Sequence, residues 1–350
     1  MENLVVERPF LWDYLTEVKK PIVLYGMGNG ADRIIDACDK RDIPINAVFA
    51  SDEFVRGQTY RGNLVMPYEE AKERYGDMII LVAFGTHDPE VMARIRQLGE
   101  EQELYQPCLD FVSGTPYTQV LFDVQSEGLR NAYDMLADDL SRKTFKNILN
   151  FKITGDPQYL YDCEVPRDKS IYTDLLRLTN HEMVVDAGAY DGDTVHELYD
   201  AVGGWKFLMA FEPDPHNFRK LERNTQQYKG VRCVNSAIGA MNGWIDFAIA
   251  EGRQSHVSED GKPVHLYSID KMAPSATYIK MDVEGSELQG LHGAQTVIRG
   301  NSPRLNIAAY HHHDDLFEIP LYISSMNKKY KVYLRHFPCL PDWDTCYFFV

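Results

Sequence analysis

Short apolar runs alternate with longer polar, helix-like stretches in two parts of the chain, and this alternation constrains the fold more than any other feature. The first part extends from residue 21 to residue 111, with helical patterns at 31–40 and 89–98. A strand, a helix and a further strand in succession are typical of a parallel α/β unit. The strand candidates of this part are 21–25, 46–50 and 78–83.

The alternation resumes at Met183 and continues to the end of the chain. The strand candidates here are 183–186, 207–212, 231–235, 278–282, 305–310, 330–335 and 346–350. We expect helical stretches between the first five of them. The last two have no helix between them, which predicts an antiparallel pair at one end of the sheet. The expected fold class is therefore α/β, with two α/β domains.

The middle of the chain has a different pattern. Leu129, Tyr133, Leu136 and Leu140 recur at a spacing that places them on one face of a helix. We interpret this stretch as a packing helix that joins the two domains. The expected boundaries are 1–119 for the N-terminal domain, 120–170 for the helical linker and 171–350 for the C-terminal domain.

Composition limits the classes of partner. The 350 residues are 44% hydrophobic and 25% charged, enough for a sizeable core without disulfides or structural metals. Subtracting 52 acidic from 36 basic residues gives a formal net charge of −16. A surface that binds phosphates needs the opposite sign, so we expect neither a nucleic-acid partner nor an anionic membrane partner.

The cysteines and the apolar runs indicate a compartment. The six cysteines are scattered and form no Cys-x-x-Cys pair, which favours reduced thiols in the cytoplasm. The apolar run Met78–Phe84 has seven residues, whereas a membrane-spanning helix needs about 20. The N-terminus carries charged residues and shows no signal peptide. The sequence thus predicts a cytoplasmic protein without a membrane span.

A glycine-rich turn follows the first strand of the second part, and ligands of open α/β sheets bind outside the carboxyl ends of the strands. The turn reads Asp-Ala-Gly-Ala-Tyr-Asp-Gly-Asp over residues 186–193. Gly188 and Gly192 permit a tight turn, and Asp193 is expected to cap a helix that begins near Thr194. Because the turn presents carboxylates, it suits a cationic or amino-bearing ligand better than a pyrophosphate.

Two further strands of this part also end in carboxylates. Glu212, in Phe-Glu-Pro-Asp over residues 211–214, is placed to accept both hydroxyls of a ribose. Asp282 and Glu284 follow the strand at 278–282 and share a side if the strand continues that far. Each carboxylate alone has an alternative as a helix cap, but three acidic strand ends at one crevice predict a binding site.

These segments resemble known motifs. Residues 184–193 resemble the first motif of S-adenosylmethionine-dependent methyltransferases, and residues 211–214 resemble their ribose-binding acidic loop. Residues 278–287, with Leu-His-Gly-Ala at 291–294, are similar to the signature of the FkbM family. The resemblance covers about residues 180–350. The chain has Ala309 where many members carry a Glu, so no base role is carried over to that position.

The resemblance implies a Rossmann-like methyltransferase sheet with S-adenosylmethionine along the first three strand ends. Asp186, Gly188 and Tyr190 would face its methionine part, and Glu212 would hold its ribose. Asp282 would lie near the sulfonium and the acceptor. The expected cofactor-binding residues are Asp186, Gly188, Ala189, Tyr190, Asp191, Gly192, Thr194, Glu212, Pro213, Ser236, Ala237 and Asp282.

A run of histidines follows the strand at 305–310, and an alcohol acceptor would need a general base. We favour His311 as this base, with Asp282 and Glu284 as the competing catalytic residues. A structural or substrate-orienting role and a metal site completed by Asp314 or Asp315 are the alternatives. Adjacent strand residues point to opposite faces, so we expect no metal site from the three histidines if the strand continues.

The N-terminal domain contains Gly26-x-Gly28-x-x-Ala31 between a strand and a helix, which is close to a dinucleotide fingerprint. Asp52 would then meet a ribose. We favour a scaffold, substrate-selecting or dimerising role for this Rossmann-like domain over nucleotide or nucleotide-sugar binding.

The expected function is transfer of a methyl group from S-adenosylmethionine to a small-molecule acceptor, with a hydroxyl of a sugar, a glycan precursor or another metabolite favoured. One alternative is an NAD-dependent or nucleotide-sugar-binding enzyme that uses the N-terminal turn. The other is a non-catalytic module that binds S-adenosylmethionine.

Overall fold

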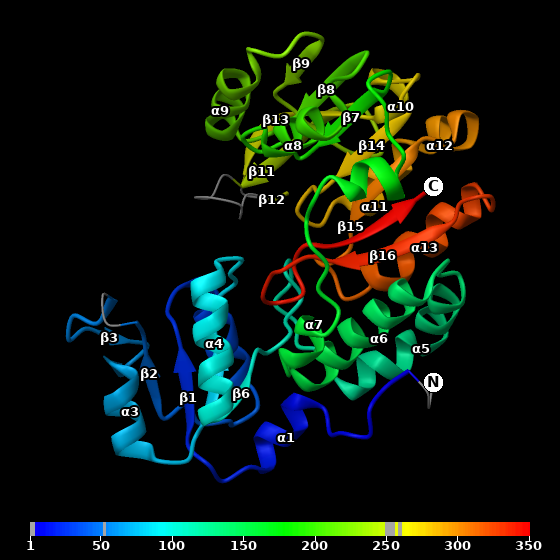
Figure 1. The fold of residues 1–350 in the computed structure, drawn as a ribbon. Coiled ribbons are helices and arrows are strands. Elements are labelled where there is room, and N and C mark those ends of the chain that lie inside the picture. Colours follow the sequence, from blue (N-terminus) through cyan, green and yellow to red (C-terminus); the bar gives the residue numbers. More distant parts are fainter. Residues whose placement is uncertain (1–3, 52–53, 249–255, 258–260) are drawn as a thin grey trace. The chain divides into compact units, whose positions relative to one another are not determined.

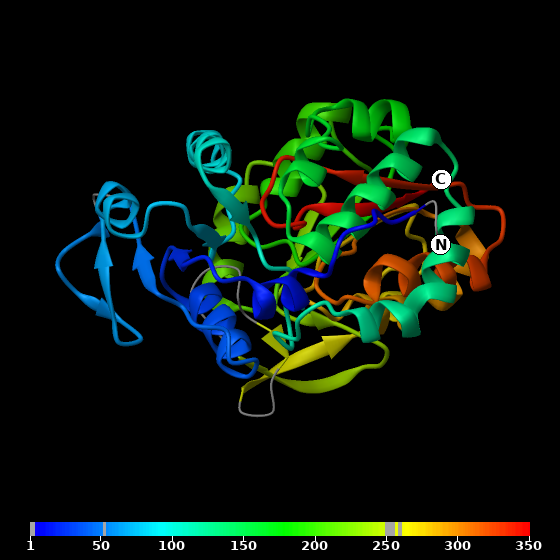
Figure 2. The same ribbon diagram turned by 90° about the horizontal axis from the view of Figure 1, so that it is seen from below.

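The computed structural model describes residues 4–51, 54–248, 256–257 and 261–350. The chain folds into two compact units, each built from more than one segment (Figure 1, Figure 2). Unit 1 comprises Met1–Arg130, Arg142–Val165 and His336–Asp344, and unit 2 comprises Asn131–Ser141, Pro166–Arg335 and Thr345–Val350. The sequence-based boundaries at 119 and 170 remain predictions.

Unit 1 contains a six-stranded sheet in the order β3-β4-β2-β1-β5-β6. Its neighbouring strands are parallel except for β3 and β4, which are antiparallel. The three strands expected in this part of the chain are confirmed as β1, β2 and β5. The strands are β1 Ile22–Tyr25, β2 Ala47–Phe49, β3 Thr59–Tyr60, β4 Asn63–Met66, β5 Ile79–Val82 and β6 Glu103–Tyr105.

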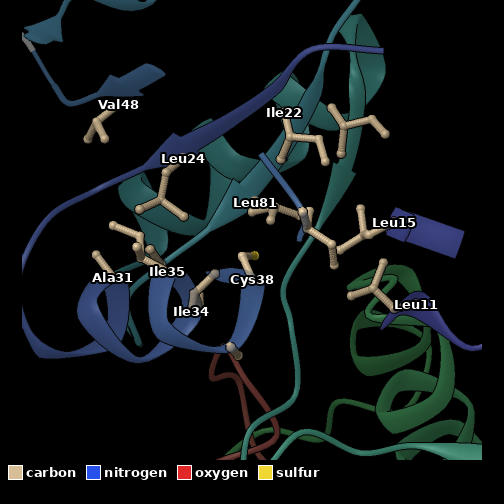
Figure 3. Close-up of a cluster of buried hydrophobic side chains, with 14 of the residues drawn as sticks. Leu11, Leu15, Ile22, Leu24, Ala31, Ile34, Ile35, Cys38, Val48 and Leu81 are labelled. Atoms are coloured by element: carbon tan, nitrogen blue, oxygen red, sulfur yellow. The ribbon is translucent and has the colours of Figure 1, made fainter. Parts of the chain in front are cut away.

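Helix α2 carries the apolar face that packs on this sheet. Ala31, Ile34, Ile35 and Cys38 follow helical spacing, are buried, and point toward Leu24 and the neighbouring strand residues in Figure 3. Burial of each such aliphatic side chain contributes about 1.5–3 kcal/mol. Five helices lie wholly within unit 1: α1 Leu11–Glu17, α2 Asn29–Asp39, α3 Tyr68–Tyr75, α4 Pro89–Glu101 and α7 Gln158–Tyr161.

The middle of the chain forms two helices, whereas we had expected one helix with a continuous apolar face. Helix α5 spans Gln119–Asp134 and α6 spans Asp139–Thr154. The carboxylate of Asp138 accepts a hydrogen bond of 2.8 Å from the N–H of Ser141, so it caps α6 and starts a new helix there. Leu140 therefore lies on a different helix from Leu129 and is 38% exposed. The prediction of one continuous face is wrong.

The main sheet of unit 2 has seven strands in the order β16-β17-β15-β14-β7-β8-β9. The strands β15, β14, β7, β8 and β9 are parallel to one another, and β17 is antiparallel to β15. Lys331 and Val350 exchange two backbone hydrogen bonds, which is the antiparallel pattern. The expected pair at one end of the sheet is thus confirmed. The strands are β7 Met183–Ala187, β8 Phe207–Phe211, β9 Val231–Val234, β14 Tyr278–Met281, β15 Arg304–Ala308, β16 Val332–His336 and β17 Thr345–Phe349.

A second, smaller sheet lies between β9 and β14 in the chain, where we had expected a helix. Its order is β10-β13-β11-β12. Apolar and polar side chains alternate from Val264 to Tyr267, which is typical of a strand. The expectation of a helix between β9 and β14 overlooked this alternation. The strands are β10 Ala237–Ile238, β11 Gly243–Ala248, β12 His256–Val257 and β13 Lys262–Tyr267.

The helices of unit 2 complete its α/β architecture. They are the π-helix Ile171–Leu175, α8 Asp193–Val202, α9 Pro215–Thr225, α10 Ile269–Met272, α11 Glu287–His292, α12 Gln295–Asn301 and α13 Asp315–Met326. The predicted fold class, two α/β units with mainly parallel sheets, is confirmed. In the described part of the chain, no helix is both long enough and apolar enough to cross a membrane.

Candidate functional site

The carboxylate of Asp186 is buried at the carboxyl end of β7. Asp186 is 1% exposed, and neither of its side-chain oxygens has a hydrogen-bond partner among the described residues. Its nearest cation is the Nζ of Lys280, at 3.4 Å. Burial raises the pKa of Asp186 to about 6, although Lys280 opposes this shift. Because buried acceptors without donors are costly, this carboxylate is suited to receive a polar ligand.

The turn after β7 depends on glycine at two positions. Gly188 has a φ of +78°, and a Cβ atom there would lie 1.8 Å from the carbonyl oxygen of Asp282. Gly192 has a φ of +94° and is the residue before α8. Asp193 is the first residue of α8 rather than its cap, and its carboxylate accepts the N–H of Thr194 at 2.7 Å. Glycine at position 188 therefore lets the turn lie directly against the backbone of Asp282.

Glu212 connects the turns that follow β7 and β8. Its Oε2 accepts the N–H of Tyr190, and its Oε1 accepts the N–H of Asp214, both at 2.9 Å. Burial raises the pKa of Glu212 to about 7 against these hydrogen bonds. Asp214 caps α9, and Pro215 occupies the first position of this helix.

The residues after β9 hold the loop of Glu212 in place. The amide of Asn235 donates hydrogen bonds to the carbonyl oxygens of Glu212 and Pro213, at 2.8 and 3.0 Å. Ser236 is fully buried, and its hydroxyl has no hydrogen-bond partner among the described residues. Ala237 opens β10. After Asp186, the end of β9 thus adds another buried polar side chain that has no hydrogen-bond partner among the described residues.

Asp282 and Glu284 lie beyond the end of β14 at Met281. Glu284 has a φ of +54°, so the strand does not continue and the expected sharing of one strand face does not apply. The Oδ1 of Asp282 accepts a hydrogen bond of 3.0 Å from the hydroxyl of Tyr310. The side chains of Asp282 and Glu284 are 32% and 26% exposed.

His311 is fully buried among carboxylates. Its Nε2 lies 3.4 Å from Glu284 and 3.7 Å from Asp282, and its Nδ1 lies 3.1 Å from Glu287. Burial alone would lower the pKa of His311, but Glu287 and the other carboxylates raise it well above its usual value. The imidazole is therefore protonated near neutral pH. The sequence-based preference for His311 as a base rested on a neutral imidazole, which this geometry does not favour.

Glu287 also belongs to this cluster, although we had predicted no role for it. It is the first residue of α11, is 1% exposed, and accepts the N–H of Val283 at 2.8 Å. The sequence shows that Glu287 belongs to the motif at 278–287. Its contact with His311, 24 positions later, depends on the pairing of β14 with β15 and could not be read from the motif.

The other histidines of the run diverge from His311, because β15 ends at Ala308 and the run lies in a loop. The Nε2 of His312 is 3.1 Å from the carbonyl oxygen of Gly285, and its N–H donates to Asp315 at 2.7 Å. Burial raises the pKa of Asp315 to about 7. Within the described residues, the three histidines do not form a metal-compatible group with Asp314 or Asp315.

The glycine-rich turn of unit 1 is occupied by its own neighbours. The hydroxyl of Tyr60 donates to the carbonyl oxygen of Gly28 at 2.8 Å and accepts its N–H at 3.1 Å. A Cβ atom at Gly30 would lie 2.3 Å from the carbonyl oxygen of Ala83, so this glycine serves close packing of α2 on the sheet. Asp52, the expected ribose partner, lies outside the described residues.

Comparisons with known proteins agree with this geometry. No curated protein matches the chain. The crystal structure of the methyltransferase FkbM from Methylobacillus flagellatus KT matches with a TM-score of 0.72 and 24% identity, covering 95% of this chain and 90% of that one. The precorrin-6y C5,15-methyltransferase of Geobacter metallireducens GS-15 has a TM-score of 0.33 and 13% identity, covering 52% and 85%. Residues 186–330 match the methyltransferase FkbM domain, and the chain shares the fold of a solved methyltransferase.

Proposed function

We propose that the chain transfers a methyl group from S-adenosylmethionine to a hydroxyl oxygen of a small metabolite such as a sugar or a glycan precursor. One observation carries the proposal. Asp186, Glu212 and Asp282 present carboxylates at the carboxyl ends of three adjacent strands, inside the segment that matches the FkbM domain. Ligands of such sheets bind at this edge.

The side chains present at this edge fit S-adenosylmethionine. Asp186 offers two oxygens that accept no hydrogen bond from the part of the chain that the structure describes, which suits an ammonium group. Glu212 uses two of its roughly four acceptor positions on backbone N–H groups, which leaves the others for ribose hydroxyls. Gly188 and Tyr190 would then lie along the methionine part, and Ser236 would lie beside the adenine.

The donor supplies a methyl group on a positively charged sulfur, which an acceptor oxygen displaces in line. The chain's own contribution is to hold donor and acceptor in that geometry, an effect worth up to about 7–11 kcal/mol. The acceptor proton must also leave. Asp282 and Glu284 are partly exposed whereas His311 is not, so we assign proton removal to one of these carboxylates. His311, whose Nε2 lies 3.7 Å from Asp282 and 3.4 Å from Glu284, then orients them.

Unit 1 is proposed to be a Rossmann-like domain that selects the acceptor or mediates dimerisation. Its turn has both backbone groups of Gly28 bonded to Tyr60, which disfavours the NAD-dependent alternative. The proposed location is the cytoplasm, and the six scattered cysteines, which form no Cys-x-x-Cys pair, support this.

A methyl-transfer assay distinguishes the proposed methyltransferase from the NAD-dependent enzyme and from the non-catalytic binding module. The full chain is incubated with S-adenosylmethionine and a panel of sugars and hydroxyl-bearing metabolites, and S-adenosylhomocysteine and the methylated product are measured by mass spectrometry. We expect one acceptor class to be methylated, with D282N much slower and D314N unchanged. Donor binding without transfer to any acceptor would favour the binding module. Binding of NAD but not of S-adenosylmethionine would favour the NAD-dependent enzyme.

A further inference from the structure

Three carboxylates surround the imidazole of His311. Carboxylate oxygens of Asp282, Glu284 and Glu287 lie 3.7, 3.4 and 3.1 Å from its nitrogens. Glu287 and His311 are at most 1% exposed. Buried carboxylates are found where they are paired or coordinate a metal ion.

Three of these residues have the spacing of a metal site. One ligand atom each from Asp282, Glu287 and His311 lie within 4.8 Å of one another. Asp282 follows β14, Glu287 begins α11, and His311 follows β15, so the pairing of β14 with β15 fixes their arrangement. The group is therefore built by the main sheet of unit 2 rather than by one exposed loop.

A second observation points to a ligand at the same place. Glu287 is 1% exposed, its Oε1 faces His311, and its Oε2 has no hydrogen-bond partner among the described residues. A buried carboxylate oxygen without a donor is costly because it has lost its water. Coordination to a metal ion would satisfy it.

We infer that unit 2 binds one divalent cation between Asp282, Glu287 and His311, with Glu284 beside it. Because only a neutral imidazole can coordinate a metal ion, His311 releases its proton to solvent when the cation binds. Two carboxylates and one imidazole favour a first-row ion such as Mn²⁺ over Ca²⁺ or Mg²⁺, whose sites are built from oxygen. A soft ion such as Cu⁺ is disfavoured because the group contains no thiolate or thioether. The inference does not depend on methyl transfer, since the ligands belong to the folded chain alone.

Direct binding of Mn²⁺ tests the site. The full chain is freed of metal with a chelator, desalted and titrated with Mn²⁺ without donor or acceptor, and the free ion is followed by electron paramagnetic resonance. We expect one Mn²⁺ per chain. D282N and H311Q should weaken binding at least about 10-fold, the effect of losing a group in or around a metal site. D314N removes a charge from the same loop outside the group and should leave the affinity within about 2-fold.

Comparing the variants also distinguishes the loss of a metal ligand from the loss of the fold. The side chain of Asp282 is one-third exposed, so D282N should keep the thermal unfolding midpoint of the wild type even if H311Q does not. No saturable binding up to about 1 mM, the weak end of protein cation sites, would overturn the inference. So would equal affinities of D282N and D314N. Either result would leave the methyl-transfer proposal intact, because no donor is present.

Discussion

The carbonyl oxygen of Asp282 lies 1.8 Å from the point that a Cβ atom of residue 188 would occupy. The turn after β7 and the end of β14 therefore touch through their backbones. This contact sets the spacing between Asp186 and Asp282, the two carboxylates that we assign to the donor and to the acceptor. A side chain at position 188 would separate them.

Replacing Gly188 by alanine should cost both stability and donor binding. G203A is the matched control, because Gly203 also has a positive φ, +77°, but has no atom within 4 Å of its Cβ position. G203A should lose about 1–2 kcal/mol of unfolding free energy through backbone strain alone. G188A should lose at least about 2 kcal/mol more, through the overlap with Asp282. Urea unfolding measures both, and equal losses would show that the contact is not restrictive.

Donor affinity should rise with pH between about 5 and 8. The pKa values of Asp186 and Glu212 are about 6 and about 7, so both acids are neutral at the low end and ionised at the high end. Only the ionised forms attract the positive donor. Calorimetric titration over this range should show the rise, with its lower part missing in D186N. A flat or falling profile in the wild type would contradict these assignments.

The same shifts have the opposite effect on the protein without donor. Because the folded pKa values exceed the unfolded ones, the unfolded chain releases these protons first as pH rises. The unfolding free energy should therefore fall from about pH 4 to about pH 7 through these two groups. Donor binding should recover part of the loss.

Replacing His311 by glutamine should lower turnover by about 10–100-fold, the effect of losing a group that orients reactive side chains, and leave donor affinity nearly unchanged. The substitution removes the imidazole that faces three carboxylates, whereas the proposed donor residues Asp186 and Glu212 lie on β7 and directly after β8. H312Q is the control and should have less effect, because the ring of His312 faces the carbonyl oxygen of Gly285. Full activity of H311Q would exclude the cluster from catalysis.

Unit 1 contains a buried ion pair that should dominate its stability. The Nζ of Lys152 lies 3.0 Å from Asp342, and the two side chains are 3% and 5% exposed. D342N leaves a buried charge without its partner and should cost about 3–5 kcal/mol of unfolding free energy. R8A breaks the pair with Asp156, in which Arg8 is 55% exposed, and should cost at most about 1 kcal/mol. Similar losses in the two variants would refute this ranking.

The main strands and the carboxylates at their ends could be predicted because their signals are local. Apolar runs ending in Asp186, Glu212 and Asp282 are visible in the sequence, and parallel pairing brings such ends to one edge of a sheet. The helix cap at Asp214 followed by Pro215 is equally local. These features needed no knowledge of distant contacts.

The remaining features depend on contacts that periodicity does not report. The contact of Glu287 with His311 requires β14 and β15 to pair, and the full burial of His311 follows from the packing around that pair. The break between α5 and α6 follows from one capping carboxylate, Asp138, inside an otherwise helical pattern. Such short signals are easily outweighed by a longer apolar spacing.

Titration of S-adenosylmethionine into the full chain by calorimetry tests the central claim most directly. We predict saturable binding at one site per chain, and a loss of about 1.5–3 kcal/mol of binding free energy in E212Q, which removes the charged acceptor for the ribose. E222Q, which changes an exposed carboxylate on α9, should bind like the wild type. Absence of binding in the wild type, or equal binding by folded E212Q and E222Q, would contradict the account.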